Sequence, residues 1–346
     1  MAVEQPNIES WFLHHDLVLK LLGPNAARQL ATLAPTEAEP FSRLRTKALL
    51  EEALADYIEE ADIASLNELH MTEQLLAGQL VWLDQVFYFR GVEDAYYKSK
   101  RGDAERASFW TKLSTDKQLE VHADINARWV TSDTGAHMLS GSRRQFVLAF
   151  VESVSPERVS IRTILIGQRR YFDRRYRMSV PLEDAAHVWP NAIDQFSEVD
   201  FSKRSSKSAL EELRHVPEEA VKHWFAEIIG EPDVPKDWGG EQYDLWTRHL
   251  TIQGERVRTA IAFKGPAAFH PMQIADLGKN GDQIQRLAHS PADLLVVQHC
   301  HSISSSVEHM LRLIATTPGH LRRYTLIDGY TTVAILRHFE YLPITP

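Results

Sequence analysis

The chain has 346 residues, of which 44% are hydrophobic and 25% are charged, and this composition is typical of an ordinary globular protein with about two or three domains. The formal net charge of −9 excludes a chain coated in basic surface, although an acidic protein can still concentrate positive potential in one cleft. The single cysteine, Cys300, excludes an internal disulfide framework and a cysteine-rich zinc module. The N-terminus lacks the basic and apolar run of a signal peptide, and no stretch is long enough to span a membrane. We therefore expect a cytoplasmic protein without a membrane partner.

The first part of the chain, residues 1–135, is predicted to be a helical domain. Apolar residues recur at helical spacing around residues 12–21 and 49–58. The region is also rich in aromatic side chains, which indicate core packing, and a base-stacking surface is their alternative use. These aromatic residues are Trp82, Phe87, Tyr88, Phe89, Tyr96 and Tyr97.

Residues 136–205 are predicted to form a β-rich module and a linker. Two stretches rich in β-branched residues, 145–151 and 159–166, are separated by a turn-like segment and predict a hairpin. The basic and aromatic run that follows suits a nucleic-acid backbone with stacked bases, and the alternative is a solvated strand whose arginines pair with carboxylates. The candidate nucleic-acid-binding residues in this run are Arg169, Arg170, Arg174 and Arg175.

Residues 206–346 predict a mixed sheet flanked by helices, because helical and strand patterns alternate. A helix is expected over residues 217–229, with a proline in its first turn and Gly230 at its end. Strands follow at about 243–252 and 255–264. The remaining expected elements are a helix at 281–289, a strand at 293–298, a helix at 304–315, a strand at 324–327 and a helix at 331–339.

Two charged residues on neighbouring predicted strands are the strongest functional signal in the chain. Asp244 follows Gly240-Glu241-Gln242-Tyr243, and Lys264 ends Thr259-Ala260-Ile261-Ala262-Phe263-Lys264. An acid and a lysine on adjacent antiparallel strands can hold a divalent cation against a phosphate and stabilise the attacking water. The alternative is an ordinary cross-strand ion pair.

Together with the order helix, antiparallel hairpin, helix and strand, these residues resemble the PD-(D/E)xK nuclease superfamily over about residues 216–346. The resemblance implies a restriction-endonuclease-like fold, Mg²⁺ or Mn²⁺ as cofactor, and nucleic acid as the partner. Asp244 and Lys264 fall on the first and last positions of the family's motif, whereas Ala262 occupies the place of its second acid. The expected fold class is thus an α+β or α/β multidomain protein with a helical N-terminal region and a β-rich middle segment.

Further ligands and phosphate contacts are expected around this pair. Glu241 lies three residues before Asp244 and could fold back onto it, and the resemblance implies an extra metal-binding acid on the first helix, at Glu218 or Glu219, of which we favour Glu219. It also implies that Gln283 lies near the scissile phosphate. Lys279 would add charge before that helix, whose N-terminal amides can bind phosphate.

The site depends on how the two strands pair. A two-residue turn at Gln253-Gly254 would pair Asp244 with Phe263 and put Lys264 on the opposite face, because side chains alternate along a strand. A three-residue turn would pair Asp244 with Lys264, and only that parity, or a β-bulge, builds a site. We predict the odd-length turn.

The leading hypothesis is a metal-dependent nuclease that hydrolyses DNA or RNA, as a restriction or defence effector. Ala262 motivates the alternative of a catalytically silent nucleic-acid-binding or regulatory protein that retains the nuclease fold. A scaffold that forms a homo-oligomer through its N-terminal helices is a third hypothesis. His299 and His301 have a spacing that can ligate zinc, but a partly buried strand end is the favoured interpretation. Nothing in the sequence matches a hydrolase elbow, a P-loop or a dinucleotide fingerprint.

Overall fold

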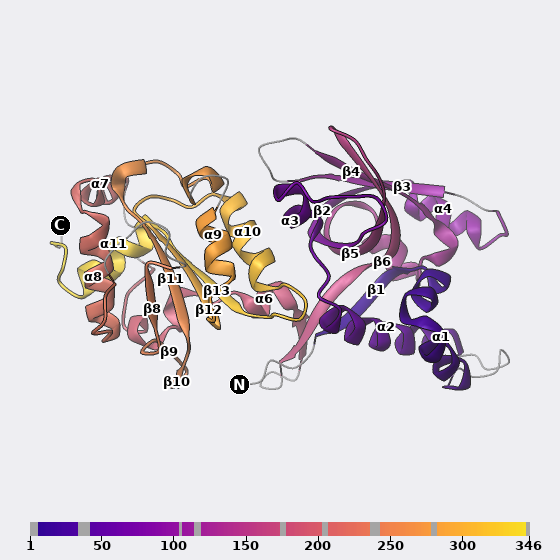
Figure 1. The fold of residues 1–346 in the computed structure, drawn as a ribbon, viewed down its shortest axis with the longest axis horizontal. Helices are drawn as coiled ribbons and strands as arrows, with labels where there is room; N and C mark the ends of the chain where they lie inside the picture. The colour runs from indigo at the N-terminus through magenta and orange to yellow at the C-terminus, as the bar shows by residue number, and fades with distance from the viewer. Residues whose placement is uncertain are drawn as a thin grey trace. The chain divides into compact units, whose positions relative to one another are not determined.

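The computed structural model describes residues 6–33, 42–103, 106–113, 119–173, 178–202, 207–235, 243–277 and 282–343. The chain divides into two compact units, Met1–Leu182 and Glu183–Pro346 (Figure 1). The predicted boundary at 135/136 lies inside the first unit, because strands on both sides of it belong to one sheet. Within the described residues, no helix is both long and apolar enough to cross a membrane.

A seven-stranded sheet forms the centre of the first unit, within the part that the structure describes. Its strands are β1 (Asn7–Leu13), β2 (Leu80–Arg90), β3 (Arg106–Lys112), β4 (Glu120–Asn126), β5 (Gly141–Val154), β6 (Arg158–Asp173) and β7 (Met178–Pro181). The strand order is β1-β6-β4-β3-β2-β5, and a further pairing of β5 with β6 closes β2, β3, β4, β6 and β5 into a barrel. β4 and β6 pair in parallel, and the other barrel pairs are antiparallel. The five strands therefore form a closed barrel with one parallel pair.

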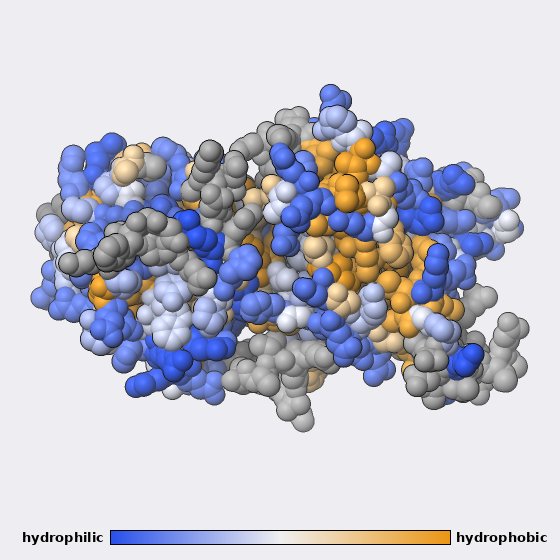
Figure 2. All heavy atoms as spheres, in the orientation of Figure 1, coloured by the Kyte–Doolittle hydropathy of each residue, from blue (hydrophilic) through white to orange (hydrophobic). Residues whose placement is uncertain are grey.

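Helices surround this barrel. They are α1 (His15–Leu33), α2 (Ser42–Glu60), α3 (Leu66–Met71), α4 (Val92–Ser99) and α5 (Asp133–Met138), with a 3-10 turn, η1 (Ala127–Trp129), between β4 and α5. Figure 1 shows α1 and α2 side by side along β1. Figure 2 shows hydrophobic residues gathered over the barrel strands of this unit, with hydrophilic residues around them.

The expectation of a helical N-terminal region is correct for α1 and α2 and wrong for β2, β3 and β4. β2 explains the difference, because buried Phe87 and Phe89 alternate with exposed Tyr88 and Arg90, a period of two that fits a strand and not a helix. The core-packing interpretation holds for Trp82, Phe87 and Phe89, which are at most 9% exposed. Tyr88, in contrast, is 44% exposed. The predicted hairpin at 145–151 and 159–166 is confirmed by β5 and β6.

The basic run in β6 is divided between the interior and the sheet edge. Arg169 is only 4% exposed, and its Nη2 donates a hydrogen bond to Oε1 of Glu59 in α2 at 2.6 Å. Burial lowers the pKa of the Arg169 guanidinium, and the charge of Glu59 opposes that shift. Arg170 donates to the carbonyl oxygen of Ser179 and lies 3.4 Å from Oε2 of Glu9. Arg169 and Arg170 therefore both pair with carboxylates, as the alternative interpretation of this run expected, and the buried Arg169 is not accessible to a phosphate. Arg174 and Arg175 lie outside the described residues.

The buried pair predicts a large effect on stability. Replacing Arg169→Met leaves the Glu59 carboxylate, itself 9% exposed, without this counter-charge, and we expect the free energy of unfolding to fall by about 3–5 kcal/mol. Urea denaturation followed by tryptophan fluorescence measures the loss. The double variant Glu59→Leu, Arg169→Met should recover much of it, and a double variant as unstable as the sum of the two single variants would contradict the pairing.

The second unit contains a mixed sheet with the order β13-β12-β11-β8. β8 (Leu245–Thr247) is antiparallel to β11 (Thr259–Lys264), which is parallel to β12 (Leu294–His299), and β12 is parallel to β13 (Arg323–Ile327). Helices α8 (Glu218–Ile229) and α11 (Gly329–His338) contribute to the core on one face, with Ile261 and Phe263. Helices α9 (Asp282–Ala288) and α10 (Ser305–Ala315) pack on the other, with Ala260 and Ala262. The predicted mixed sheet flanked by helices is confirmed.

Smaller elements complete this unit. They are α6 (Leu182–Ala186), which starts at the last residue of the first unit, α7 (Lys207–Glu211), the short strands β9 (Thr251–Ile252) and β10 (Glu255–Arg256), and the 3-10 turns η2 (Pro190–Ala192), η3 (Asp194–Phe196), η4 (Glu212–His215), η5 (Pro266–Ala268) and η6 (Ile274–Leu277).

The predicted odd-length turn between the two site strands is wrong. Ile252 pairs with Glu255 across a two-residue turn, Gln253-Gly254, whose φ angles of 55° and 77° fit the primed turns of tight hairpins. The register then shifts, since residue 251 faces residue 256 whereas residue 247 faces residue 259. Three residues thus separate β8 from β9 and two separate β10 from β11. The extra residue acts as the bulge that the sequence left open and returns Asp244 and Lys264 to one face of the sheet.

Candidate functional site

Asp244 lies at the start of β8, beside the end of β11. Its main-chain N–H donates to the carbonyl oxygen of Ile261 at 3.0 Å. Its Oδ2 accepts a hydrogen bond from the main-chain N–H of Phe263 at 2.6 Å and another from Nε2 of Gln283 at 3.1 Å. Gln283, in α9, is 6% exposed. The structure therefore brings together Asp244 and Gln283, two of the residues proposed from the sequence, and holds the carboxylate in a fixed orientation.

Ala262 follows the last residue of β11 that pairs with β8. The register ends with Ile261 opposite Leu245, and its extension by one step would bring residue 262 opposite Asp244. Side chains at such opposed positions have Cβ atoms about 4.5–5.5 Å apart, a separation at which two carboxylates can share one cation. Ala262 is 1% exposed and belongs to the apolar cluster of α9 and α10. The position at which the PD-(D/E)xK motif has its second acid thus falls opposite the first one in the extended register, but it is occupied by a methyl group.

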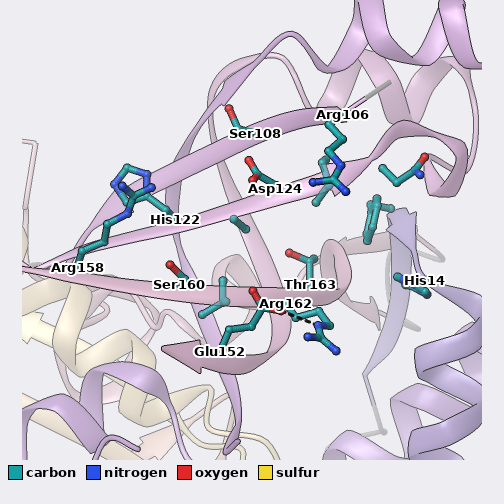
Figure 3. A pocket seen from close by; sticks show the side chains of 15 residues that line it. His14, Arg106, Ser108, His122, Asp124, Glu152, Arg158, Ser160, Arg162 and Thr163 are labelled. Carbon is teal, nitrogen blue, oxygen red and sulfur yellow. Dashed lines mark hydrogen bonds and ion pairs between the residues drawn. The ribbon is translucent and has the colours of Figure 1, made fainter. Parts of the chain in front are cut away.

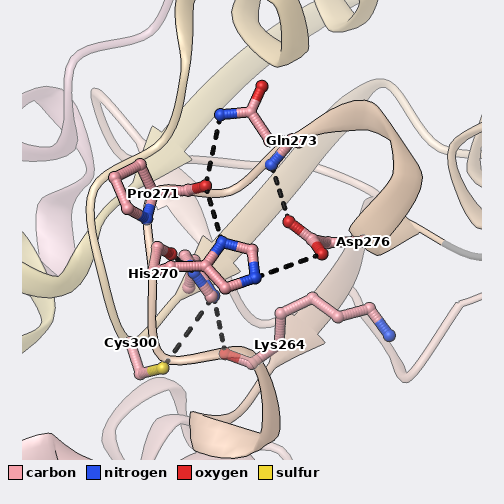
Figure 4. A network of polar contacts seen from close by, with 7 residues as sticks. Lys264, His270, Pro271, Gln273, Asp276 and Cys300 are labelled. Atoms are coloured by element: carbon pink, nitrogen blue, oxygen red, sulfur yellow. Dashed lines mark hydrogen bonds and ion pairs between the residues drawn. The ribbon is translucent and has the colours of Figure 1, made fainter. Parts of the chain in front are cut away.

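Lys264 follows two residues later on the same face. Its carbonyl oxygen accepts from the main-chain N–H of Cys300 at 3.2 Å and lies 3.2 Å from Nδ1 of His299. Figure 4 shows its side chain extending away from these main-chain contacts. Within the described residues the structure assigns no ion pair to its Nζ, so the side chain is available to a ligand.

Glu218 of α8, and not Glu219, contacts the residue that follows β11. Oε2 of Glu218 accepts a hydrogen bond from the main-chain N–H of Gly265 at 2.6 Å. The approach is so close that a Cβ at residue 265 would lie 2.6 Å from the Cβ of Glu218. Glu219 instead lies 3.1 Å from Nε2 of His223 and 3.6 Å from Nζ of Lys222. Adjacent helical residues point about 100° apart, so only one of the two acids can reach the strand, and the structure does not support our preference for Glu219.

The described acids do not form a metal site. Among the residues that the structure describes, no group of three or more His, Cys, Asp or Glu is placed to hold a metal ion. Mg²⁺ and Mn²⁺ require several hard oxygen donors, whereas Oδ2 of Asp244 already accepts hydrogen bonds from Phe263 and Gln283, and Oε2 of Glu218 accepts one from Gly265. This donor set therefore does not fit a tightly held divalent cation. Glu241 and Lys279, also proposed from the sequence, lie outside the described residues.

The histidines at the end of β12 do not converge on a common ligand position. His299 is fully buried, with Nδ1 facing the carbonyl oxygen of Lys264 and Nε2 lying 3.0 Å from that of His270 (Figure 4). Nδ1 of His301 accepts from the main-chain N–H of Ser302 at 2.8 Å. The same figure shows His270 and Asp276 linked beside them, with Nε2 and Oδ1 3.7 Å apart. This arrangement agrees with the buried strand end favoured from the sequence.

Cys300 lies in this segment and is 2% exposed. Burial raises the pKa of its thiol from 9.0 to about 11, so roughly a hundredfold less thiolate is present at pH 8 than in the unfolded chain. We expect a disulfide reagent to label Cys300 at least about a hundredfold more slowly in the native protein than in urea. Below pH 11 the native rate should increase with pH, because only the thiolate reacts. Rapid labelling of the native protein at pH 7 would contradict this placement.

The second unit also contains a pocket that the sequence did not predict. It has a volume of about 660 Å³ and lies beyond the end of β13, where Leu326 and Asp328 line it together with His187, Trp189 and Glu308. Burial lowers the pKa of His187, which stacks on Tyr324. These residues come from separate segments of the chain, so no local pattern in the sequence indicates that they line one pocket.

Comparisons of the chain with protein-family models, with curated proteins and with solved structures gave no match. The resemblance to the PD-(D/E)xK superfamily therefore remains a prediction that depends on the residues and strand order described above.

Proposed function

We propose that the second unit is a nuclease-like domain that binds a phosphodiester group of DNA or RNA without hydrolysing it. The observation that carries the proposal is Ala262, which follows the last paired residue of β11 and stands at the position where the resemblance requires a second metal-binding acid beside Asp244. Three features support the likeness to a nuclease: the antiparallel and parallel neighbours of β11, the helix α9 between β11 and β12, and the common face of Asp244 and Lys264.

The side chains present suit binding better than cleavage. Lys264 supplies a positive charge at the end of β11, and a lysine ammonium binds phosphate as a point charge. Asp244 and Gln283 are hydrogen-bonded to each other, which orients the Gln283 amide beside the same strand end. Hydrolysis would need a cation to generate hydroxide and to offset charge in the transition state. Asp244 alone is too small a donor set for that cation.

A metal-dependent nuclease is the second candidate, and Glu218 is the observation that favours it. Its carboxylate reaches the end of β11 from α8, so it is a second acid near Lys264 that comes from another element. In that case Asp244 and Glu218 would hold Mg²⁺ or Mn²⁺, and the chain would be a metal-dependent nuclease of the kind that restriction or defence effectors use.

The variants Ala262→Asp and Ala262→Glu test the proposal. A carboxylate restored opposite Asp244 should tighten Mn²⁺ binding by about tenfold or more, since ligand charge count sets affinity over orders of magnitude. Isothermal titration calorimetry measures this change. Cleavage of labelled DNA and RNA with Mn²⁺ should be absent for the natural chain and present for one of the variants. Thermal melting controls for the cost of a carboxylate at this buried position.

Two further variants separate the candidates. Adding Asp244→Asn to the Ala262→Glu chain should abolish both metal binding and cleavage. If the natural chain cleaves and Lys264→Ala abolishes cleavage, the second candidate is correct and the silent domain is wrong. If folded Ala262 variants neither bind Mn²⁺ nor cleave, the site is not nuclease-like.

A further inference from the structure

Three aromatic rings form a row across the outer face of the barrel in the first unit. Tyr88 of β2 pairs with Trp110 of β3, which pairs with His122 of β4. The Tyr88 and Trp110 rings stack with centroids 4.5 Å apart and an interplanar angle of 18°, and Trp110 and His122 stack at 6.4 Å and 21°. Tyr88 is 44% exposed, and the other two are partly exposed. Because the three rings stack on one another outside the core, the row presents their edges and the outer faces of Tyr88 and His122 to a planar ligand.

An open groove of about 520 Å³ begins at the His122 end of this row. Figure 3 shows its lining from β3, β4 and β6, with Ser108, Asp124 and Ser160 on the strands and His122 close to Arg158 at one end. Ser160 pairs with His122 on the neighbouring strand. Because serine is small, the space beside the imidazole is left open.

Two arginines of this groove have no ionic partner within the described residues. Arg162 pairs with Glu152 at 2.7 Å, whereas no ion pair involves Arg106 or Arg158 among those residues. Arg106 lies across from residue 126 at one end of β4, and Arg158 lies across from residue 120 at the other. Six residues of strand span about 20 Å, so the two guanidinium groups mark the two ends of the groove.

We propose that this face of the barrel binds single-stranded nucleic acid. Bases would stack on the outer faces of Tyr88 and His122, which Trp110 holds in place between them, and Arg106 and Arg158 would contact the phosphates. Stacking on aromatic side chains requires unpaired bases, and arginines along a groove follow the backbone, which together select a single strand over a duplex. Asp124 lies on the groove floor, where its carboxylate can accept hydrogen bonds from the amino groups of bases.

The charge of the chain makes such a site selective. With a net charge of −9, the protein as a whole repels a polyanion, so binding must come from a local surface. This surface belongs to the first unit and differs from the arginines proposed from the sequence, of which Arg169 is buried. Its binding does not depend on the site at Asp244, and the test therefore includes EDTA to exclude metal-dependent binding or cleavage.

Fluorescence anisotropy with labelled oligonucleotides of about 12 nucleotides, a length within the usual site sizes of such barrels, tests the proposal. Oligo(dT) and oligo(rU) distinguish DNA from RNA, and a duplex of equal length serves as competitor. Trp110→Ala should weaken binding by about tenfold or more, and Trp110→Phe should retain most of it, since it keeps a stacking ring. The double variant Arg106→Gln, Arg158→Gln should reduce the slope of log affinity against log salt by about 1.4, or about 0.7 for each lost phosphate contact.

The matched controls are Trp189→Ala and Arg256→Gln, which remove an exposed tryptophan and an exposed arginine from the second unit and should leave affinity unchanged. Thermal melting verifies that each variant folds. The proposal is overturned if the natural chain binds neither oligonucleotide, if folded Trp110→Ala binds as well as the natural chain, or if the duplex competes as well as an unlabelled single strand.

Discussion

The alternation of side chains along β-strands is the constraint on which both candidate surfaces depend. On β11, Ala260, Ala262 and Lys264 point to the side of α9 and α10, and the chain reaches β8 through a segment with one extra residue, which turns Asp244 to that same side. On β3, Phe109 points into the barrel while Ser108 and Trp110 point out. A shift of one residue between β8 and β11 would put Asp244 and Lys264 on opposite faces of the sheet. A shift of one residue on β3 would turn Ser108 and Trp110 into the barrel.

In the second unit, the hydrogen bonds of Asp244 decide whether its carboxylate can bind a cation. Asp244 is held by the main-chain N–H of Phe263 and by the side-chain amide of Gln283, and both hydrogen bonds fall on its Oδ2 atom and orient the carboxylate. Oε2 of Glu218 likewise accepts a hydrogen bond from the main-chain N–H of Gly265. A cation would have to compete with these hydrogen bonds, and a neighbouring carboxylate is what would favour it. With alanine at residue 262 the balance favours the hydrogen-bonded arrangement, and Lys264 remains as the group that can attract a phosphate.

The two proposals assign complementary tasks to the two units. One fold can host many unrelated functions, so the barrel of the first unit is not itself an argument for any ligand. The argument comes from the aromatic row and from the two arginines, which are features of this sequence. A chain that gathers single strands on one unit and contacts a phosphodiester on another would bind nucleic acid at two places by different chemistry, stacking in one and charge in the other.

The sequence alone determined helices α8 to α11 and strands β11 to β13 of the second unit, and the residues worth examining there. Its helices and strands could be predicted because strong periodic patterns, a proline at the start of α8 and Gly230 in the left-handed conformation at its end are local signals. Whether Lys264 lies on the same face of the sheet as Asp244 could not be decided from the sequence, because one extra residue between β8 and β9 reverses the answer. Glu218 and Glu219 were not distinguishable, because their difference is a rotation of the helix against β11.

Tertiary structure decided the rest. β2, β3 and β4 are stabilised by pairing with segments far away in the chain, and closure by β5 and β6 defined which aromatic residues fill the barrel and which lie outside it. Arg169 and Arg158 belong to the same strand, yet one is buried against α2 and the other is exposed. Burial depends on what packs against each face of a strand, and that is a property of the assembled sheet and not of the local sequence.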